Sequence, residues 1–136
     1  LVPLGKANVI VEGNDISIIA HGKAVHTALE VAEELSDKHN ISAEVLDLRS
    51  IRPLDEEAII QSVKKTNRVV LVEENKPFCG VDAQICFLIQ DKAFDYLDAP
   101  IARVSAVDAP QAYSKALESI QLPGKEKVLR AALNIL

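Results

Sequence analysis

The chain has 136 residues, of which 49% are hydrophobic and 26% charged, a composition typical of one globular domain with a single core. Its formal net charge of −5 argues against nucleic acid or an anionic membrane as a partner and favours a basic one. No apolar run approaches the roughly 20 residues that a membrane span requires. The chain contains no methionine, so we expect it to be part of a longer protein, and the absence of a visible targeting segment is then uninformative.

In chain order, residues 1–7 are predicted to be a linker from a missing N-terminal domain, and residues 8–136 to form one further domain. In 8–136, short apolar runs alternate with segments whose apolar residues recur every three or four positions. The predicted strands are 8–11, 16–22, 41–51, 68–74 and 101–107, and the predicted helices are 23–38, 55–65, 80–94, 113–120 and 125–136. This order predicts an α/β fold with three layers, in which helices cover both faces of a mostly parallel sheet.

The junction between the strand at 41–51 and the helix at 55–65 is the most distinctive local pattern. Pro53 cannot continue a strand ladder, so the strand must end before it. Asp55 can cap the following helix, whose acidic first turn suits the positive end of the helix dipole. A strand that leads into a helix in this way is the repeating half-unit of an α/β sheet.

The helix at 80–94 contains five consecutive apolar residues, 85–89, which cover most of its circumference. A small domain has few places to bury such a helix completely, so we predict a subunit or domain contact rather than a deep core helix. The predicted interface residues are Val81, Ile85, Phe87, Leu88 and Ile89.

Polar side chains at the carboxyl ends of the strands are the candidates for chemistry, because ligands of such sheets bind there. His21 could act as a base or bind phosphate, although a histidine in such a loop is more often hydrogen-bonded to backbone. Glu73 and Glu74 are adjacent in a strand, so their side chains point to opposite faces and do not easily share a proton. Arg49 could bind phosphate, although Asp47 offers it an ion pair.

Motifs with a known catalytic or metal-binding mechanism are missing from the sequence. There is no phosphate-binding glycine loop, no nucleophile elbow, and no metal-ligand spacing among the three histidines. Cys79 and Cys86 match neither a zinc nor a redox spacing, and we interpret them as buried, reduced thiols. The residues alone therefore predict a packing and docking domain. A stand-alone small-ligand enzyme, with a site near His21 and Arg49, is the alternative from another class.

Residues 47–55, Asp-Leu-Arg-Ser-Ile-Arg-Pro-Leu-Asp, closely resemble the transketolase-like C-terminal domain of thiamine-diphosphate-dependent 2-oxo-acid dehydrogenases. The resemblance extends over nearly the whole chain, and residues 77–81 and 94–100 are specifically similar to pyruvate dehydrogenase beta subunits. The beta subunits of branched-chain 2-oxo-acid and acetoin dehydrogenases share the architecture and agree less at those two places. The matching domain of deoxyxylulose-phosphate synthase or transketolase is a further alternative, against which residues 94–100 argue.

This resemblance implies that the full enzyme is an oxidoreductase, a heterotetramer that decarboxylates pyruvate and acetylates the lipoyl groups of dihydrolipoyl acetyltransferase. Thiamine diphosphate and magnesium would bind between the alpha subunit and the missing N-terminal domain, so no cofactor and no catalysis are expected in this domain. The domain would pair with a second beta subunit and dock the subunit-binding domain of the acetyltransferase. The implied docking residues are Asp98 and, where it ends the natural chain, Leu136.

The resemblance also implies a compartment, which is the cytoplasm for a bacterial source and the mitochondrial matrix or plastid for a eukaryotic one. Three places depart from the family pattern. Lys76 stands where many relatives have tryptophan, Asp82 replaces a glycine, and Gln111 with Ala112 replaces a pair that usually ends in proline. Because Asp82 lies in the first turn of a predicted helix, we expect the helix dipole to stabilise its carboxylate.

Overall fold

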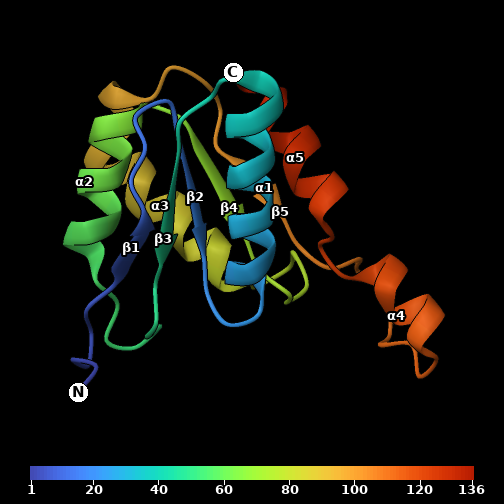
Figure 1. Cartoon of the computed structure of the whole chain (residues 1–136). Coiled ribbons are helices and arrows are strands. Elements are labelled where there is room, and N and C mark those ends of the chain that lie inside the picture. The colour runs from blue at the N-terminus through green and yellow to red at the C-terminus, as the bar shows by residue number, and fades with distance from the viewer.

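The computed structural model describes all 136 residues, which form one five-stranded sheet with helices on both faces (Figure 1). The strands are β1 (Asn8–Val11), β2 (Ile16–Ala20), β3 (Ala43–Asp47), β4 (Val69–Val72) and β5 (Ala102–Val104). The helices are α1 (Ala24–His39), α2 (Glu56–Thr66), α3 (Val81–Ala93), the short 3-10 helix η1 (Phe94–Tyr96), α4 (Lys115–Gln121) and α5 (Lys125–Leu133). The spatial order is β1-β3-β2-β4-β5, and only β1 is antiparallel to its neighbour. The predicted three-layer α/β fold is therefore confirmed.

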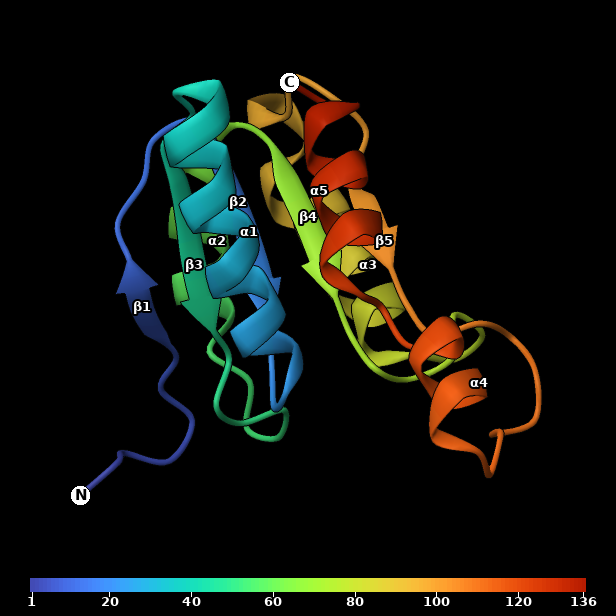
Figure 2. The same ribbon diagram turned by 45° about the vertical axis from the view of Figure 1, so that its right-hand side comes forward.

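The sheet separates two hydrophobic cores. Helices α1 and α5 cover one face and α2 and α3 cover the other, as two views of the ribbon show (Figure 1, Figure 2). All five residues of the central strand β2 are buried. Ile16 and Ile18 contribute to the core under α1, and Ile19 contributes to the core under α2. Because successive side chains of a strand point to opposite faces, a strand covered on both sides is apolar throughout.

The parallel strands place different segments at the two ends of the sheet. Residues 1–7, the loop after β3 and α4 lie at the carboxyl end of the strands (Figure 1). Helix η1 and the C-terminus lie at the opposite end (Figure 1). The residues considered for catalysis and the residues considered for docking are therefore separated by the length of the sheet.

The helices lie close to their predicted bounds, whereas β3 and β5 are shorter than predicted. Strand β3 ends at Asp47, whose Oδ1 accepts a hydrogen bond from the backbone N–H of Arg49 at 2.9 Å. Arg49 has a positive φ of 55°, which turns the chain out of the sheet. Strand β5 pairs with β4 through three residues before the chain leaves towards α4. None of the helices has the length and apolar character needed to cross a membrane.

Asp55 caps α2 as predicted. Its Oδ1 accepts a hydrogen bond from the backbone N–H of Ala58 at 3.3 Å. Its Oδ2 accepts a second bond, at 3.1 Å, from the backbone N–H of Ala7. The carboxylate therefore satisfies a free donor of the helix and also fixes the start of β1 to the same point.

Three buried hydroxyl groups join the central strand to α2. Ser17 Oγ lies 2.6 Å from Ser62 Oγ and 2.7 Å from Thr66 Oγ1. All three residues are buried, and Thr66 Oγ1 also donates towards the backbone carbonyl of Ser62 or Arg68. A buried hydroxyl is costly only when it lacks a partner, so this hydroxyl cluster is stable because its members satisfy one another.

We predict that Ser17→Ala lowers the free energy of unfolding by about 1–3 kcal/mol, because it removes a partner shared by two buried hydroxyls. Urea denaturation followed by circular dichroism measures this change. The matched control is Ser119→Ala on the exposed helix α4, which should stay within about 0.5 kcal/mol of the unmodified chain. Equal effects of the two substitutions would show that the hydroxyl cluster contributes nothing to stability.

Candidate functional site

Three segments that are far apart in the sequence meet around Arg68, which precedes β4. Arg68 Nε donates a hydrogen bond to the backbone carbonyl of Ile135 at 2.9 Å. Arg68 Nη1 lies 3.8 Å from Asp98 Oδ2. The guanidinium therefore joins the turn after η1 to the C-terminal residues, and it places Asp98 and the segment that ends in Leu136 on one surface.

The backbone under this surface holds the Asp98 turn against α2. Asn67, which ends α2 with a positive φ of 62°, accepts a hydrogen bond from the backbone N–H of Asp98 at 2.9 Å. The Asn67 side chain donates a bond to the backbone carbonyl of Tyr96 at 2.7 Å. Lys64 Nζ lies 4.9 Å from the centre of the Tyr96 ring, within the range of a cation–π contact. These contacts within the chain anchor the turn to α2, so no partner protein is needed to hold it there.

We define the candidate docking surface as Tyr96, Asp98, Leu133 and Leu136, a set that combines an acidic group with apolar area. The Asp98 side chain is 58% exposed, and the other three side chains are also exposed. A basic partner that carries an apolar patch would complement it. Sequence reasoning missed Arg68, since nothing local to the start of β4 indicates that residues 98 and 135 lie beside it.

The five residues predicted to form a subunit interface divide between the core and the surface of α3. Ile85, Leu88 and Ile89 belong to the core between α2, α3 and the sheet, and at most 7% of any of them is exposed. The structure corrects the prediction for these three residues, because the domain itself covers them. Phe87 is 65% exposed and Val81 is half-buried, so these two remain available to a second subunit.

The residues considered for catalysis do not form a catalytic group at the carboxyl end of the sheet. His21 is half-buried and its Nδ1 has no hydrogen-bond partner, so the expected bond to backbone is not formed by that atom. Arg49 binds Asp47 through its backbone N–H and not through its guanidinium, contrary to the expected ion pair. Glu73 is buried and Glu74 exposed, but β4 ends at Val72, so both acids lie after the strand and not, as predicted, within it. No cluster of His, Cys, Asp or Glu side chains is arranged to hold a metal ion.

A buried acidic pair, Glu73 and Asp82, lies where β4 leads into α3. Glu73 is fully buried, and its Oε2 accepts a hydrogen bond from the backbone N–H of Val81 at 3.0 Å. Its Oε1 lies 3.6 Å from Arg103 Nη2. Asp82 is 1% exposed and its Oδ2 has no partner. Glu73 therefore caps α3, whereas Asp82 is left without a compensating contact at that oxygen.

The environment of Asp82 overturns the expectation that the helix dipole stabilises its carboxylate. Burial, reinforced by the negative charge of Glu73, raises the pKa of Asp82 to about 7, although Arg103 acts in the opposite direction. Desolvation disfavours the charged form more than the first turn of α3 favours it. The sequence shows an acid at this position but not that Glu73, which follows β4, is a second buried acid beside it.

Both cysteines are unbonded, as expected for reduced thiols. Cys79 is exposed, which corrects the prediction of a buried thiol, because it lies in the loop that precedes α3. Cys86 is half-buried within α3. Burial raises the pKa of its thiol, so Cys86 is kept in the unreactive, protonated form.

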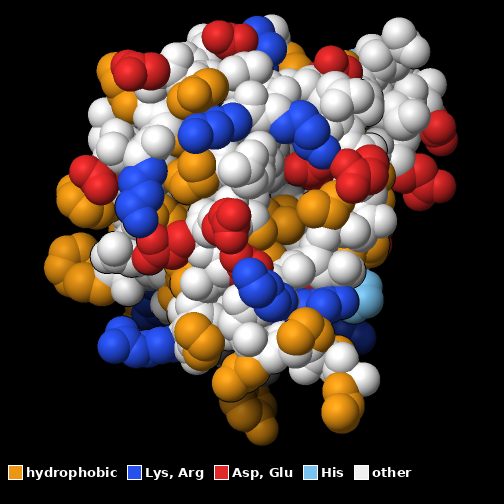
Figure 3. Space-filling view, turned by 90° about the vertical axis from the view of Figure 1, so that its left-hand side faces the viewer, with side chains coloured by type: hydrophobic (Ala, Val, Ile, Leu, Met, Phe, Trp, Pro, Cys, Tyr) orange, Lys and Arg blue, Asp and Glu red, His pale blue; other side chains and the backbone are white.

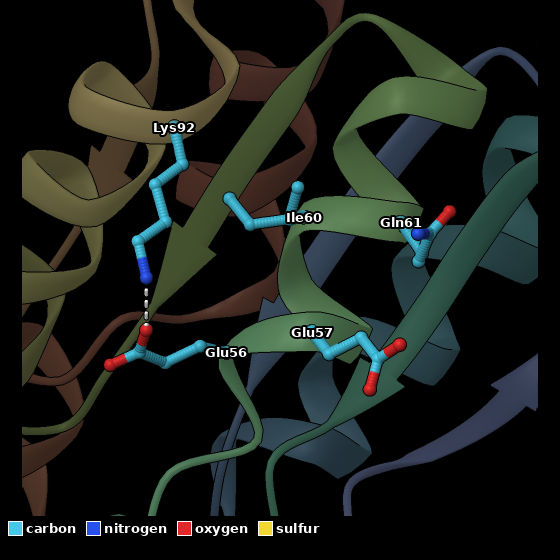
Figure 4. Close-up of a pocket in the computed structure, with 5 residues that line it drawn as sticks. All are labelled: Glu56, Glu57, Ile60, Gln61 and Lys92. Atoms are coloured by element: carbon cyan, nitrogen blue, oxygen red, sulfur yellow. Dashed lines mark hydrogen bonds and ion pairs between the residues drawn. The ribbon is translucent and has the colours of Figure 1, made fainter.

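A shallow groove between α2 and α3 is the hollow drawn in Figure 4, lined by Glu56, Glu57, Ile60, Gln61 and Lys92. An ion pair of 2.6 Å between Lys92 Nζ and Glu56 Oε2 joins the two helices there. Ile60 is the one apolar residue of the lining, and acidic and basic side chains are interspersed over this face of the molecule (Figure 3). Because small-molecule sites enclose most of the ligand and this groove is shallow and open to solvent, it is a poor ligand site.

Residues 5–128 match the family model described as the C-terminal domain of transketolase. The chain belongs to this family, which confirms the resemblance seen in its sequence. Among solved structures, a split-gene transketolase described as an inactive beta4 tetramer superimposes with a TM-score of 0.82 and 27% identity. That match covers 97% of this chain and 41% of the other.

The curated relatives are beta subunits of oxidoreductases. The chain is 49% identical over 131 residues to the mitochondrial pyruvate dehydrogenase E1 component subunit beta-1 of Oryza sativa, which covers 96% of this chain and 35% of the relative. It is 48% identical over 137 residues to the mitochondrial E1 subunit beta of Drosophila melanogaster, covering 100% and 37%. It is 47% identical over 135 residues to the acetoin:2,6-dichlorophenolindophenol oxidoreductase subunit beta of Bacillus subtilis, covering 99% and 39%. The chain thus spans less than two fifths of these relatives' length.

We predict that Asp82→Asn makes the domain more stable at pH 8 by up to about 4 kcal/mol. The folded-state pKa of about 7 lies above the ordinary value of 3.8, so the folded state keeps a proton that the unfolded state releases. The stability of the unmodified chain should therefore fall as the pH rises from 4 to 7, and the asparagine variant should lack this fall. Urea denaturation at intervals of pH measures both.

The control for this prediction is Asp91→Asn, which changes an exposed acid on the same helix. It should leave the pH dependence of stability as it is in the unmodified chain. A pH profile of Asp82→Asn that follows the unmodified chain between pH 4 and 7 would show that Asp82 titrates normally.

Proposed function

We propose that the chain is the C-terminal domain of the beta subunit of a pyruvate dehydrogenase, where it supports subunit assembly and docks dihydrolipoyl acetyltransferase. The observation that carries this proposal is the identity of 44–49% with pyruvate dehydrogenase E1 beta subunits of six eukaryotes over nearly the whole chain. In the full heterotetramer the enzyme decarboxylates pyruvate and acetylates lipoyl groups. The domain itself contributes surfaces and no reacting group.

Thiamine diphosphate and magnesium belong, in this proposal, to the part of the enzyme outside this chain. Thiamine diphosphate supplies the carbanion chemistry of the decarboxylation there. The residues of this domain do not fit that group, because no cluster of carboxylates or histidines could hold the metal and no glycine-rich loop could hold the diphosphate. In this proposal the domain instead orients partner proteins around the cofactor site.

The proposed partners are the alpha subunit, a second beta subunit through Val81 and Phe87, and the subunit-binding domain of the acetyltransferase through Asp98 and Leu136. Support for the last comes from Arg68, which contacts both Asp98 and Ile135. The net charge of −5 favours a basic docking partner. We place the protein in the cytoplasm if its source is bacterial, and in the mitochondrial matrix or plastid if it is eukaryotic.

An acetoin-oxidising enzyme is the second candidate. The Bacillus subtilis subunit is 47% identical to this chain, a value inside the range of the pyruvate dehydrogenase relatives. Turnover of the assembled enzyme with pyruvate and with acetoin separates the two. Activity with acetoin and none with pyruvate would replace the first proposal with the second.

We predict that Asp98→Ala weakens binding of the isolated subunit-binding domain of dihydrolipoyl acetyltransferase by about tenfold, because a partner cation loses its carboxylate. Isothermal titration calorimetry measures the dissociation constant. The matched control is Asp95→Ala, which removes an exposed acid from η1 outside the docking surface. Docking through Asp98 is excluded if both variants bind as the unmodified chain does.

We also predict that the chain self-associates through the exposed face of α3, and that Phe87→Ser raises the dimer dissociation constant about tenfold. Sedimentation equilibrium measures this constant. Leu117→Ser is the control, since it removes an apolar side chain of similar exposure, 57% against 65%, from α4. A monomeric unmodified chain, or equal weakening by the two variants, contradicts an interface on α3.

A further inference from the structure

We propose that Arg68 is the positioning residue of the docking surface, where it fastens residues 134–136 beside Asp98 so that a basic partner meets both at once. The inference rests on the proposed docking function. The inference adds Arg68 to the residues that serve docking. Arg68 does not itself contact the partner and acts through the two segments that it joins.

Arg68 projects from a rigid point of the fold. Its backbone carbonyl accepts a hydrogen bond of 2.8 Å from the backbone N–H of Ser17 in the central strand. The same carbonyl lies 3.1 Å from Thr66 Oγ1, a member of the buried hydroxyl cluster. The base of the side chain is thus tied to the core, and the guanidinium can hold the two surface segments at a fixed place.

The segments that Arg68 joins depend on it to different degrees. The Asp98 turn has its own anchor, the hydrogen bond from the Asp98 N–H to the carbonyl of Asn67. Residues 134–136 follow the last helix, and their backbone hydrogen bonds run back into that helix. The one side-chain hydrogen bond that reaches them comes from Arg68, at the carbonyl of Ile135. Loss of Arg68 should therefore release the C-terminal residues more than the turn.

Attraction to a basic partner does not explain an arginine at this place. A positive charge beside Asp98 weakens the field that such a partner would meet. The separation of 3.8 Å is also longer than that of a charge-assisted hydrogen bond, and Asp98 keeps 58% of its side chain exposed. Arg68 therefore leaves the Asp98 carboxylate free for a partner while it fixes residues 134–136 beside that carboxylate.

Lys64 offers a matched control on the same surface. It is a second cation near the Asp98 turn, and its ammonium group lies over the Tyr96 ring. It forms no hydrogen bond with Asp98 or with residues 134–136. Removing either cation changes the net charge by the same amount, but only Arg68 joins the two segments.

The test compares Arg68→Gln with Lys64→Gln by calorimetry against the isolated subunit-binding domain of dihydrolipoyl acetyltransferase. We expect Arg68→Gln to weaken binding about tenfold, and Lys64→Gln to weaken it clearly less, because Lys64 contacts Tyr96 but joins no second segment. The effect of Arg68→Gln should shrink when Asp98→Ala is already present, because the two residues act together. Arg68→Lys should not restore affinity, since lysine lacks the fork that reaches two acceptors.

A second measurement uses the unbound chain and separates this inference from the docking function. Nitrogen-15 relaxation should show residues 134–136 becoming mobile in Arg68→Gln and remaining ordered in Lys64→Gln. Unchanged order in Arg68→Gln, or affinity equal to or tighter than that of the unmodified chain, overturns the role of Arg68. Failure of the unmodified chain to bind overturns the docking function alone, because the relaxation measurement still decides whether Arg68 holds the C-terminal residues.

Discussion

The pairing of β2 with a parallel strand on each side is the constraint on which the rest of the domain depends. Ile18 lies opposite Val45 of β3 and Val70 of β4, and both ladders run parallel. Parallel neighbours require crossover connections, so the chain must return over the sheet as α1 and then as α2. Because α1 and α2 return over opposite faces, both sides of β2 are covered and two separate cores form.

The same arrangement gives the two ends of the sheet different properties. At the carboxyl end, Glu73 caps α3. His21 and Arg49 form no hydrogen bond with each other there. At the opposite end, the start of β4 brings Arg68 to a surface shared by Asp98 and the C-terminal residues. The fold thus joins distant segments at the end that we propose for docking, and at the other end it uses Glu73 to cap a helix.

Patterns with a local physical cause were predictable from the sequence. The alternation of strands and helices and the Asp55 cap follow from periodicity and short-range hydrogen bonding. Features that depend on which distant segments become neighbours in the fold were not predictable from the sequence. The apolar run of α3 could be covered by a partner or by the sheet, and only the tertiary arrangement shows that the sheet covers Ile85 and Ile89. For the same reason Arg68 was missed and the environment of Asp82 was predicted wrongly, since each acquires its environment from a distant segment.

Strand β1 gives the domain a defined response to pulling. It is an edge strand that runs antiparallel to β3, and it enters from residues 1–7 at one end of the sheet while the C-terminus leaves at the other (Figure 1). A force that draws the two termini apart therefore acts along the axis of β1. Such a force loads all the hydrogen bonds between β1 and β3 at once, in shear. In a hairpin that is pulled open from its ends, the hydrogen bonds break one after another instead. Residues 1–7 thus enter the sheet at a strand whose hydrogen bonds resist tension between the termini.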